Sequence, residues 1–155
     1  MSARQGRIAC AIILTASALL MSCNGEQPAP SQEPNYALVF FDSGSTSLSK
    51  QAKQKLSDVM LEPTEPIKAV LKPDSSRMIC VTGHTDAVGA EDQNKELGQR
   101  RAVAVTKYIV ELGAPEKRIV VRSLGSSKPL VVTPPNTSAA ANRRVEVVFG
   151  CETGR

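Results

Sequence analysis

The sequence predicts an α/β fold, an α/β (α+β) two-layer sandwich with the element order βαβαββ. Short apolar runs of strand length alternate with longer segments whose apolar residues recur at helical spacing. The first five elements, βαβαβ, contain two strand-helix-strand units that share the middle strand. Such units favour parallel strands with right-handed crossovers, so both helices are expected on one side of the sheet. With 155 residues, the chain has room for one domain of ordinary size.

The first half of the domain supplies one strand and one or two helices. The strand is expected at Ala37–Phe41, and it is followed by a turn in which Thr46 or Ser47 can cap a helix. Ile67–Leu71 is expected to add one or two further helical turns. The apolar residues that share one face of the main helix are Leu48, Ala52, Leu56, Val59 and Met60.

The second half supplies three strands around a long helix. The strands are expected at Met78–Thr82, Arg118–Ser123 and Arg144–Phe149, and the helix at Asp92–Leu112. A polar loop, Gly83–Glu91, precedes the helix. Ligands of α/β sheets bind at the carboxyl edge of the strands, which is where this loop and residues 42–47 are expected.

The N-terminus has the charge and hydropathy pattern of an export signal. Arg4 and Arg7 precede an apolar run, Ile8–Leu20, and residues 1–22 contain no acid. The run has 13 residues, fewer than the roughly 20 that a membrane-spanning helix needs. We therefore expect residues 1–22 to be a signal peptide, and the alternative is a membrane-spanning anchor.

The signal ends in Leu20-Met21-Ser22-Cys23, which resembles the lipobox of bacterial lipoproteins. This resemblance implies that Cys23 is the first mature residue and carries acyl chains such as palmitate. The alternative is a cleavage site next to an unmodified cysteine. The residue directly after Cys23 is Asn24 and not an aspartate, which by resemblance to enteric-type sorting implies an outer-membrane location, with the domain facing the periplasm. Residues 23–35, with three prolines, are expected to form a tether of about 37 Å.

Charge and cysteine content narrow the function classes further. Without residues 1–22, 17 basic and 15 acidic residues remain, and the whole chain has only five aromatics, so nucleic-acid binding is excluded. Cys80 and Cys151 remain after removal of the signal and lipidation of Cys23. In an oxidising compartment two such thiols suggest a disulfide.

Several spaced motifs resemble one known family. They are Gly83-His84-Thr85-Asp86, Gly89, Asn94, Leu97, Arg101-Ala102 and Asn142-Arg143-Arg144-Val145-Glu146. Together they resemble the OmpA C-terminal domain family, which includes the peptidoglycan-associated lipoproteins and MotB, over roughly residues 37–150. The resemblance implies a domain at 36–151 with a tail at 152–155. It also implies a mixed four-stranded sheet in which the last strand runs antiparallel between the others, with two main helices on one face.

The family binds the diaminopimelate residue of the peptidoglycan stem peptide, whose side-chain end carries an ammonium and a carboxylate. By resemblance, Asp86 binds the ammonium and Arg101 binds the carboxylate through its planar guanidinium. Arg101 also lies at the edge of the buried helix stripe, where a guanidinium needs an anionic partner. The alternative is an Arg101–Asp86 ion pair that serves only folding, and both interpretations can hold in the empty site.

Four further residues are expected at the site. Thr85 and Asn94 line the loop, Arg144 lies beside the same edge, and Gly44 stands where the family often has a polar Asn or Asp. The neighbouring Arg143 could equally be a solvated surface charge.

Two other positions depart from the family pattern. Gly98 replaces a usual Ser, and Ser138-Ala139 replaces a Gly-Arg pair.

The sequence contains no recognisable catalytic or metal-binding constellation. His84, the single histidine, forms at most half a metal site with Asp86, since zinc usually takes three or four protein ligands. Cys80 lies about 13 Å away from His84 along a strand, too far for a nucleophile-base pair. We expect no cofactor and no metal, and we expect His84 to fix the turn.

The leading hypothesis is a binding module that links the outer membrane to the cell wall. The alternative is an interaction module for Tol-system or other envelope proteins, and a cell-wall hydrolase is a distant third.

The family's sheet order also bears on the cysteines. Cys80 opens the second strand and Cys151 closes the fourth, so antiparallel pairing of these strands brings the two residues within disulfide range. Two separate thiols are the alternative.

Overall fold

A computed structural model describes residues 35–151. The predictions for the signal peptide, Cys23, most of the tether and the tail concern residues 1–34 and 152–155, which lie outside the described residues. The elements are β1 (Tyr36–Phe40), α1 (Lys50–Leu61), α2 (Glu65–Leu71), β2 (Met78–His84), α3 (Glu91–Glu111), η1 (Glu116–Arg118), β3 (Ile119–Gly125), η2 (Ala140–Asn142) and β4 (Arg144–Cys151).

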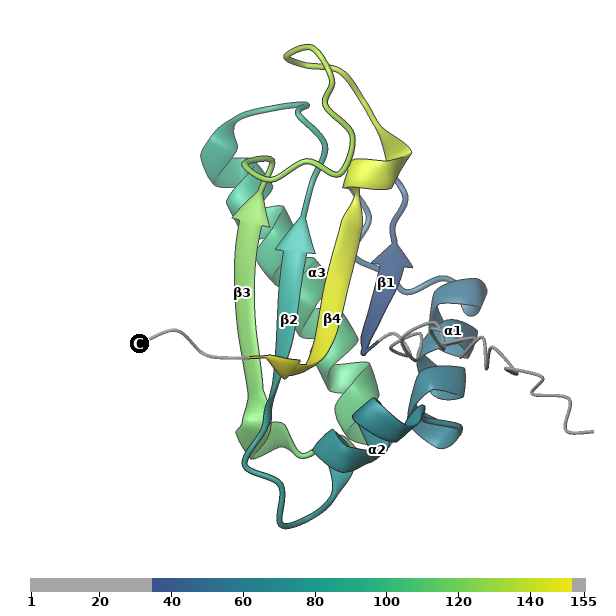
Figure 1. The fold of residues 1–155 in the computed structure, drawn as a ribbon. Coiled ribbons are helices and arrows are strands. Elements are labelled where there is room, and N and C mark those ends of the chain that lie inside the picture. Colours follow the sequence, from purple (N-terminus) through teal and green to yellow (C-terminus); the bar gives the residue numbers. More distant parts are fainter. Residues whose placement is uncertain (1–34, 152–155) are drawn as a thin grey trace, which may run out of the picture. The chain divides into compact units, whose positions relative to one another are not determined.

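The four strands form one mixed sheet in the order β1-β4-β2-β3 (Figure 1). β4 is antiparallel to both of its neighbours, and β2 is parallel to β3. The predicted mixed sheet with an inserted antiparallel last strand is therefore confirmed. β1 and β2 run in the same direction but do not pair directly, because β4 lies between them.

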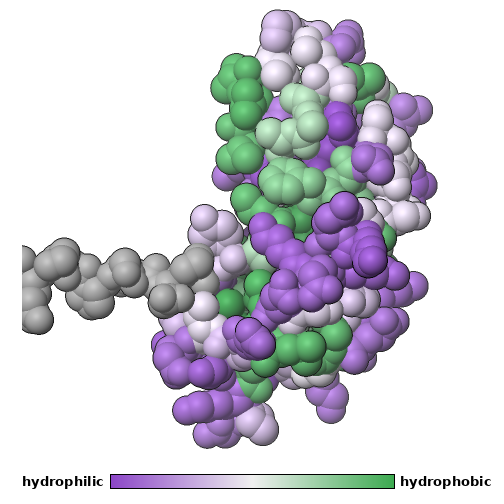
Figure 2. Space-filling view, turned by 90° about the vertical axis from the view of Figure 1, so that its right-hand side faces the viewer, coloured by the Kyte–Doolittle hydropathy of each residue, from purple (hydrophilic) through white to green (hydrophobic). Residues whose placement is uncertain are grey.

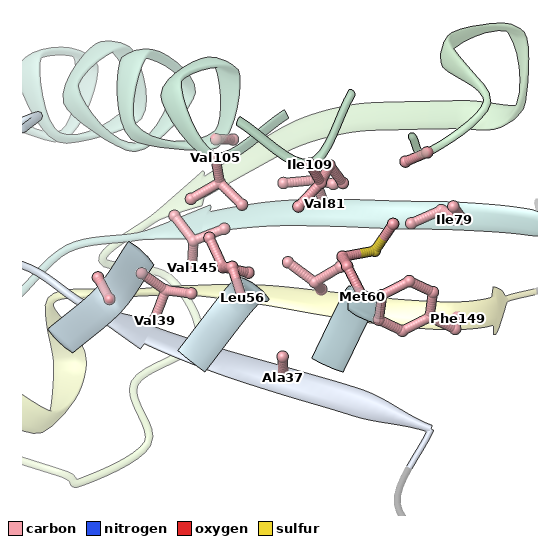
Figure 3. Close-up of a cluster of buried hydrophobic side chains, with 14 of the residues drawn as sticks. Ala37, Val39, Leu56, Met60, Ile79, Val81, Val105, Ile109, Val145 and Phe149 are labelled. Atoms are coloured by element: carbon pink, nitrogen blue, oxygen red, sulfur yellow. The ribbon is translucent and has the colours of Figure 1, made fainter. Parts of the chain in front are cut away.

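The helices and one face of the sheet enclose the hydrophobic core. α3 packs on β2 and β3, and α1 packs on β1. Figure 3 shows side chains of α1 and α3 directed toward those of the strands. Side chains alternate between the two faces of a strand, so every second residue of β4 enters this core. The core residues of the strands are Ala37, Val39, Ile79, Val81, Val145, Val147 and Phe149, and those of the three helices are Ala52, Leu56, Met60, Ile67, Val70, Ala102, Val105 and Ile109.

The start of α1 differs from the prediction. Neither Thr46 nor Ser47 caps the helix. Instead Ser49 is the N-cap, and its hydroxyl oxygen accepts a hydrogen bond of 3.1 Å from the Ala52 backbone N–H. Leu48 therefore lies before the helix, although it still packs against the core. Several residues of this segment have capping side chains, so local sequence does not decide between them.

β2 is longer than predicted, because Gly83 and His84 belong to the strand and not to the following loop. The reason is the close approach of α3. A Cβ atom added at Gly83 would lie 1.9 Å from the carbonyl oxygen of Gly98. A Cβ atom added at Gly98 would in turn lie 2.3 Å from the Ser123 hydroxyl oxygen. The two glycines allow helix and sheet to meet where any larger residue would separate them.

The structure contains the Cys80–Cys151 disulfide, with a Cα–Cα distance of 6.0 Å. Cys151 pairs with Met78 in the sheet, so the end of β4 lies beside the start of β2, as predicted. Among residues 35–151, no helix is long and apolar enough to span a membrane.

Candidate ligand-binding site

Three polar connections meet at one end of the sheet. The β1–α1 loop and the β2–α3 loop leave the carboxyl ends of their strands, and the long β3–β4 connection returns to the same end (Figure 1). This is the edge at which α/β sheets bind ligands. Asp86 and Arg101, the central predicted pair, lie in the second loop and in the helix that follows it.

Arg101 anchors the β1–α1 loop from inside the domain. Its side chain projects from α3 and is 0% exposed. The guanidinium donates hydrogen bonds to three backbone carbonyls, those of Ser45 at 2.8 Å, Asp42 at 2.9 Å and His84 at 3.3 Å. These three bonds use three of the five N–H donors of the group. Arg101 therefore ties the β1–α1 loop to the end of β2.

Within residues 35–151, no carboxylate contacts the Arg101 guanidinium directly. Burial lowers the pKa of Arg101. The negative charge of Asp86 raises this pKa, and the positive charge of Arg143 lowers it. The Phe41 ring lies 5.2 Å from the guanidinium carbon, a cation–π distance. The predicted partners Arg101 and Asp86 thus interact electrostatically but make no ion-pair contact within 4.0 Å.

Asp86 is the acceptor of a buried hydrogen-bond cluster. Its Oδ2 atom accepts from the Ser138 hydroxyl at 2.9 Å, from Arg143 Nη1 at 3.1 Å and from the Ala139 backbone N–H at 3.3 Å. Burial raises the pKa of Asp86, but the hydrogen bonds from Ser138, Arg143 and Ala139 outweigh it, so the net pKa lies below the ordinary value. Asp86 is a carboxylate at neutral pH, and all three of these bonds end on one of its two oxygens.

Arg143 is a member of the site and not a solvated surface charge. Besides its ion pair with Asp86, it donates to the Phe41 carbonyl at 3.1 Å and to the Ser138 hydroxyl at 2.9 Å. It joins the β1 end, the β2–α3 loop and the β3–β4 connection. The sequence offered one signal, its place directly before β4 in the Asn142-Arg143-Arg144 motif, but gave no indication of its partner 57 residues away.

Arg144 is not brought to this cluster. It lies on the opposite face of the sheet from the helices, where its guanidinium binds Glu146 Oε1 at 2.6 and 2.9 Å. Val145 and Val147 enter the core, so Arg144 and Glu146 must point the other way. We therefore leave Arg144 out of the candidate site, in contrast to the sequence-based expectation.

The remaining predicted residues shape the loops. Asn94 is buried and donates to the Val88 carbonyl at 3.1 Å, which holds the β2–α3 loop against α3. Thr85 is buried, its backbone N–H donates to the Gly125 carbonyl at 2.9 Å, and its hydroxyl has no partner within residues 35–151. Gly44 has a φ of 65°, a conformation that suits glycine.

Two hollows of about 430 Å³ flank the Arg101-bound loop. One is lined by Phe41, Asp42 and Arg143 among others. The other is lined by Gly44 and Asn94, together with residues of α3. Gly44 and Asn94 thus share one hollow, while Thr85 lines a third one on the far side of its loop.

Comparison of the sequence with known protein families identifies the family of this chain. Residues 40–143 match the OmpA family. The chain belongs to the OmpA family. This match includes every residue of the cluster around Asp86 and Arg101.

Relatives of this OmpA family member are envelope proteins. It is 36% identical over 89 residues to the outer-membrane lipoprotein YfiB of Pseudomonas aeruginosa, which covers 57% of this chain and 52% of that protein. It is 32% identical over 112 residues to the peptidoglycan-associated lipoprotein of Agrobacterium fabrum, covering 72% of this chain and 59% of that protein. The chain thus spans about half to three fifths of the length of these relatives.

Solved structures share the fold of the OmpA family domain. The peptidoglycan-associated lipoprotein from Burkholderia pseudomallei has a TM-score of 0.60 and 32% identity, covering 72% of this chain and 87% of that chain. The C-terminal domain of Helicobacter pylori MotB has a TM-score of 0.59 and 23% identity, covering 76% of this chain and 86% of that chain. The second likeness supports the fold alone.

The His84 side chain lies outside the cluster around Asp86. The backbone carbonyl of His84 binds Arg101, but neither ring nitrogen has a hydrogen-bond partner within the described residues. The imidazole points away from Asp86, to the face of the sheet that carries Arg144 and Glu146, with Nε2 at 3.7 Å from Glu146 Oε1. Within residues 35–151, no group of three or more His, Cys, Asp or Glu side chains is placed to hold a metal ion.

Proposed function

We propose that this protein is an outer-membrane lipoprotein that binds peptidoglycan non-covalently, through the diaminopimelate of the stem peptide, and so links the outer membrane to the cell wall. Membership of the OmpA family and the similarity to peptidoglycan-associated lipoproteins support this proposal. The observation that carries it is the presence of a buried carboxylate, Asp86, and a buried guanidinium, Arg101, at the ligand edge of the sheet, near enough for the charge of Asp86 to raise the pKa of Arg101.

The side-chain end of diaminopimelate needs an anion and a cation held close together. Asp86 is 7% exposed, and its Oδ1 atom is free of the bonds that occupy Oδ2, so we propose that Oδ1 receives the ligand ammonium. Arg101 and Arg143 supply positive charge for the carboxylate. Charged hydrogen bonds of this kind are shorter and stronger than neutral ones.

Arg101 is fully covered in the empty site, which constrains how the ligand reaches it. The carbonyls of Asp42 and Ser45 occupy the guanidinium on the loop side. We propose that the ligand carboxylate takes the place of one of these carbonyls. The exchange replaces a neutral acceptor with a charged one, so binding is favoured over the empty arrangement.

A cell-wall retention assay tests the site. Asp86→Asn should weaken retention by purified diaminopimelate-type sacculi by about 2 kcal/mol or more, about 30-fold, because it leaves the ligand ammonium unpaired. Arg101→Lys, which keeps the charge but loses the planar fork, should also weaken retention.

Matched controls are available on the exposed side of α3. Asp92→Asn removes an exposed carboxylate of its first turn, and Arg100→Ala removes an exposed arginine paired with Glu96. Both variants should be retained like the natural chain. Equal losses from Arg100→Ala and Arg101→Lys would contradict the assignment of Arg101.

We also propose that Cys23 is lipidated, with residues 1–22 as the signal peptide and the domain facing the periplasm. The Leu20-Met21-Ser22-Cys23 sequence and the names of the relatives support this. Cys23→Ser should abolish metabolic labelling by a fatty acid. Cys10→Ser, within the signal, should leave the labelling unchanged, and unchanged label in Cys23→Ser would refute the anchor.

A second candidate is an interaction module for Tol-system or other envelope proteins. Hydrophobic side chains are exposed on the loops of the ligand end, and Figure 2 shows hydrophobic surface at the upper end of the molecule. Val132 is 88% exposed, beside the half-exposed Leu130 and Val131. Exposed apolar patches mark interaction sites. Retention of the chain by an envelope protein, together with failure to bind sacculi, would favour this function.

We propose binding without chemistry on the cell wall. The sequence contains no recognisable nucleophile-base pair, and three of the four similar proteins named above are lipoproteins by name. Release of soluble fragments from purified sacculi by the protein would contradict this proposal.

A further inference from the structure

The face of the sheet opposite the helices carries a separate polar hollow of about 450 Å³. Strands β2, β3 and β4 form its floor, and the chain that follows β3 forms its rim. His84, Arg144 and Glu146 line it, whereas Asp86 and Arg101 do not. The function proposed above does not use this face, although the family resemblance had implied that Arg144 lies at the peptidoglycan site.

Two residues that line this hollow carry buried polar atoms without partners. His84 is 2% exposed, and neither Nδ1 nor Nε2 has a hydrogen-bond partner among the described residues. Arg144 is 4% exposed, and its Nη1 atom is likewise without a partner there. Buried polar groups in folded proteins are nearly always paired, so an unpaired group asks for an explanation such as an ion or ligand. Here two side chains from different strands, His84 and Arg144, carry such unpaired atoms and line the same hollow.

The charges around the hollow favour an anion. Arg122, Lys128 and Arg144 contribute three positive charges, and Glu146 contributes one negative charge, a sum of +2. Glu146 is already bound to Arg144 through two short hydrogen bonds. Burial lowers the pKa of His84 and the Arg144 charge lowers it further, whereas Glu146 and the nearby Lys128 backbone oppose them. The net pKa is lowered, so at neutral pH the imidazole is neutral with one N–H, which makes no hydrogen bond of ordinary geometry to Lys128 or to any other described residue.

Part of the lining of the hollow is apolar. Pro129 and Leu130 line it from the β3–β4 connection, and Val148 lines it from β4. Leu130 and Lys128 are exposed, and so is Arg122. Exposed side chains can change rotamer without disturbing the core, and a ligand would need such a change to reach the buried nitrogens. A ligand that fits both parts has a charged head and an apolar stem.

We propose that this hollow is a second binding site, which takes a carboxylate carried on an apolar stem. The carboxylate accepts hydrogen bonds from Arg144 Nη1 and from the N–H of the His84 imidazole. The stem lies against Leu130, Pro129 and Val148, and the charges of Lys128 and Arg122 add to the attraction. Such a group occurs at the end of a peptide chain with an apolar last residue and in a free organic acid.

The single histidine of the chain makes the test direct. Full-length protein without a histidine tag, labelled with ¹⁵N-histidine and held in detergent, gives ring signals from His84 alone. It is titrated with N-acetyl-leucine as the peptide-end probe and with hexanoate as the free-acid probe. Binding of either should shift the ring signals saturably and raise the pKa of His84, because a nearby anion favours the charged imidazolium. Response to one probe alone identifies the source.

Two control compounds complete the titration. N-acetyl-leucinamide has the same stem without the charge, and chloride has the charge without the stem. Neither should give a saturable shift. Absence of a saturable shift with both acids at tens of millimolar, or an equal response to the amide, would overturn the proposal.

Variants separate the site from general charge effects. Arg144→Gln should weaken binding of the acid at least tenfold, and Lys128→Gln, at the exposed rim, should weaken it several-fold. Arg100→Gln removes an equal charge from the exposed side of α3 and should bind as the natural chain does. If Arg144→Gln fails to fold, Lys128→Gln still decides, because unchanged binding in that variant would also contradict the site.

Discussion

Reduction of the Cys80–Cys151 disulfide is the perturbation whose magnitude follows most directly from the structure. The bridge joins residues 71 positions apart at a Cα–Cα distance of 6.0 Å. In the unfolded chain it closes a loop of that length, which removes conformational entropy worth about 4 kcal/mol at 25 °C. Small domains are stable by roughly 5 to 15 kcal/mol, so this is a large share.

The assay compares oxidised and reduced protein of the same sequence, with Cys10 and Cys23 replaced by Ser. Reduction changes no side-chain volume, so the difference isolates the bridge from cavity effects at the buried Cys80. Urea unfolding followed by circular dichroism should show the midpoint falling by roughly 2 M, for a slope of about 2 kcal/mol/M. Cys151→Ala, which leaves Cys80 as a buried thiol, should match the reduced protein.

A midpoint change of less than roughly 0.5 M would refute the reasoning, since the loop would then contribute little to the unfolded state. Alkylation offers an independent check. Protein taken from an oxidising envelope should show no labelled thiol at Cys80 or Cys151 until reductant is added.

Three further predictions concern single side chains. Gly83→Ala should lower the free energy of unfolding by about 1 to 3 kcal/mol in denaturant titrations, because its Cβ would collide with the Gly98 backbone, and unchanged stability would contradict that contact. The pKa of His84 is depressed, so the unfolded chain binds its proton more readily, and stability should fall as pH drops from 6.5 toward the lower folded-state pKa. His84→Gln should remove that slope in unfolding experiments at several pH values. The pKa of Asp86 is also depressed, so cell-wall retention should persist from neutral pH down to 3.8 and fail only below it, whereas loss near neutral pH would exclude Asp86 as the ligand carboxylate.

Periodic hydrophobicity was sufficient to predict the strands, the long helix α3 and their order. Where prediction and structure differ, a tertiary contact decides. Gly83 and His84 have the composition of a loop, yet they extend β2 because Gly98 on α3 lies directly against Gly83. Such a contact between two glycines has no local signal in either segment.

The site shows the same limit. Asp86 and Arg101 were found through motif spacing, but the carbonyl oxygens that bind Arg101 belong to the backbone of Asp42 and Ser45, which any residue supplies. Arg143 and Arg144 are adjacent and identical in type, so sequence alone could not tell which one enters the site. Strand alternation assigns them to opposite faces only once the register of β4 is known.

The direction of β1 gives the domain a mechanical property. The chain enters at Asn35, which exchanges hydrogen bonds with the backbone of Phe149, and it leaves β1 into the loop that Arg101 binds. If the N-terminus is anchored and the ligand edge is bound, tension runs along β1. All five residues of β1 are paired with β4, so the load shears these bonds together instead of peeling them one at a time. β4 is in turn fixed to β2 by the Cys80–Cys151 bridge, which places a covalent bond in the path of the force.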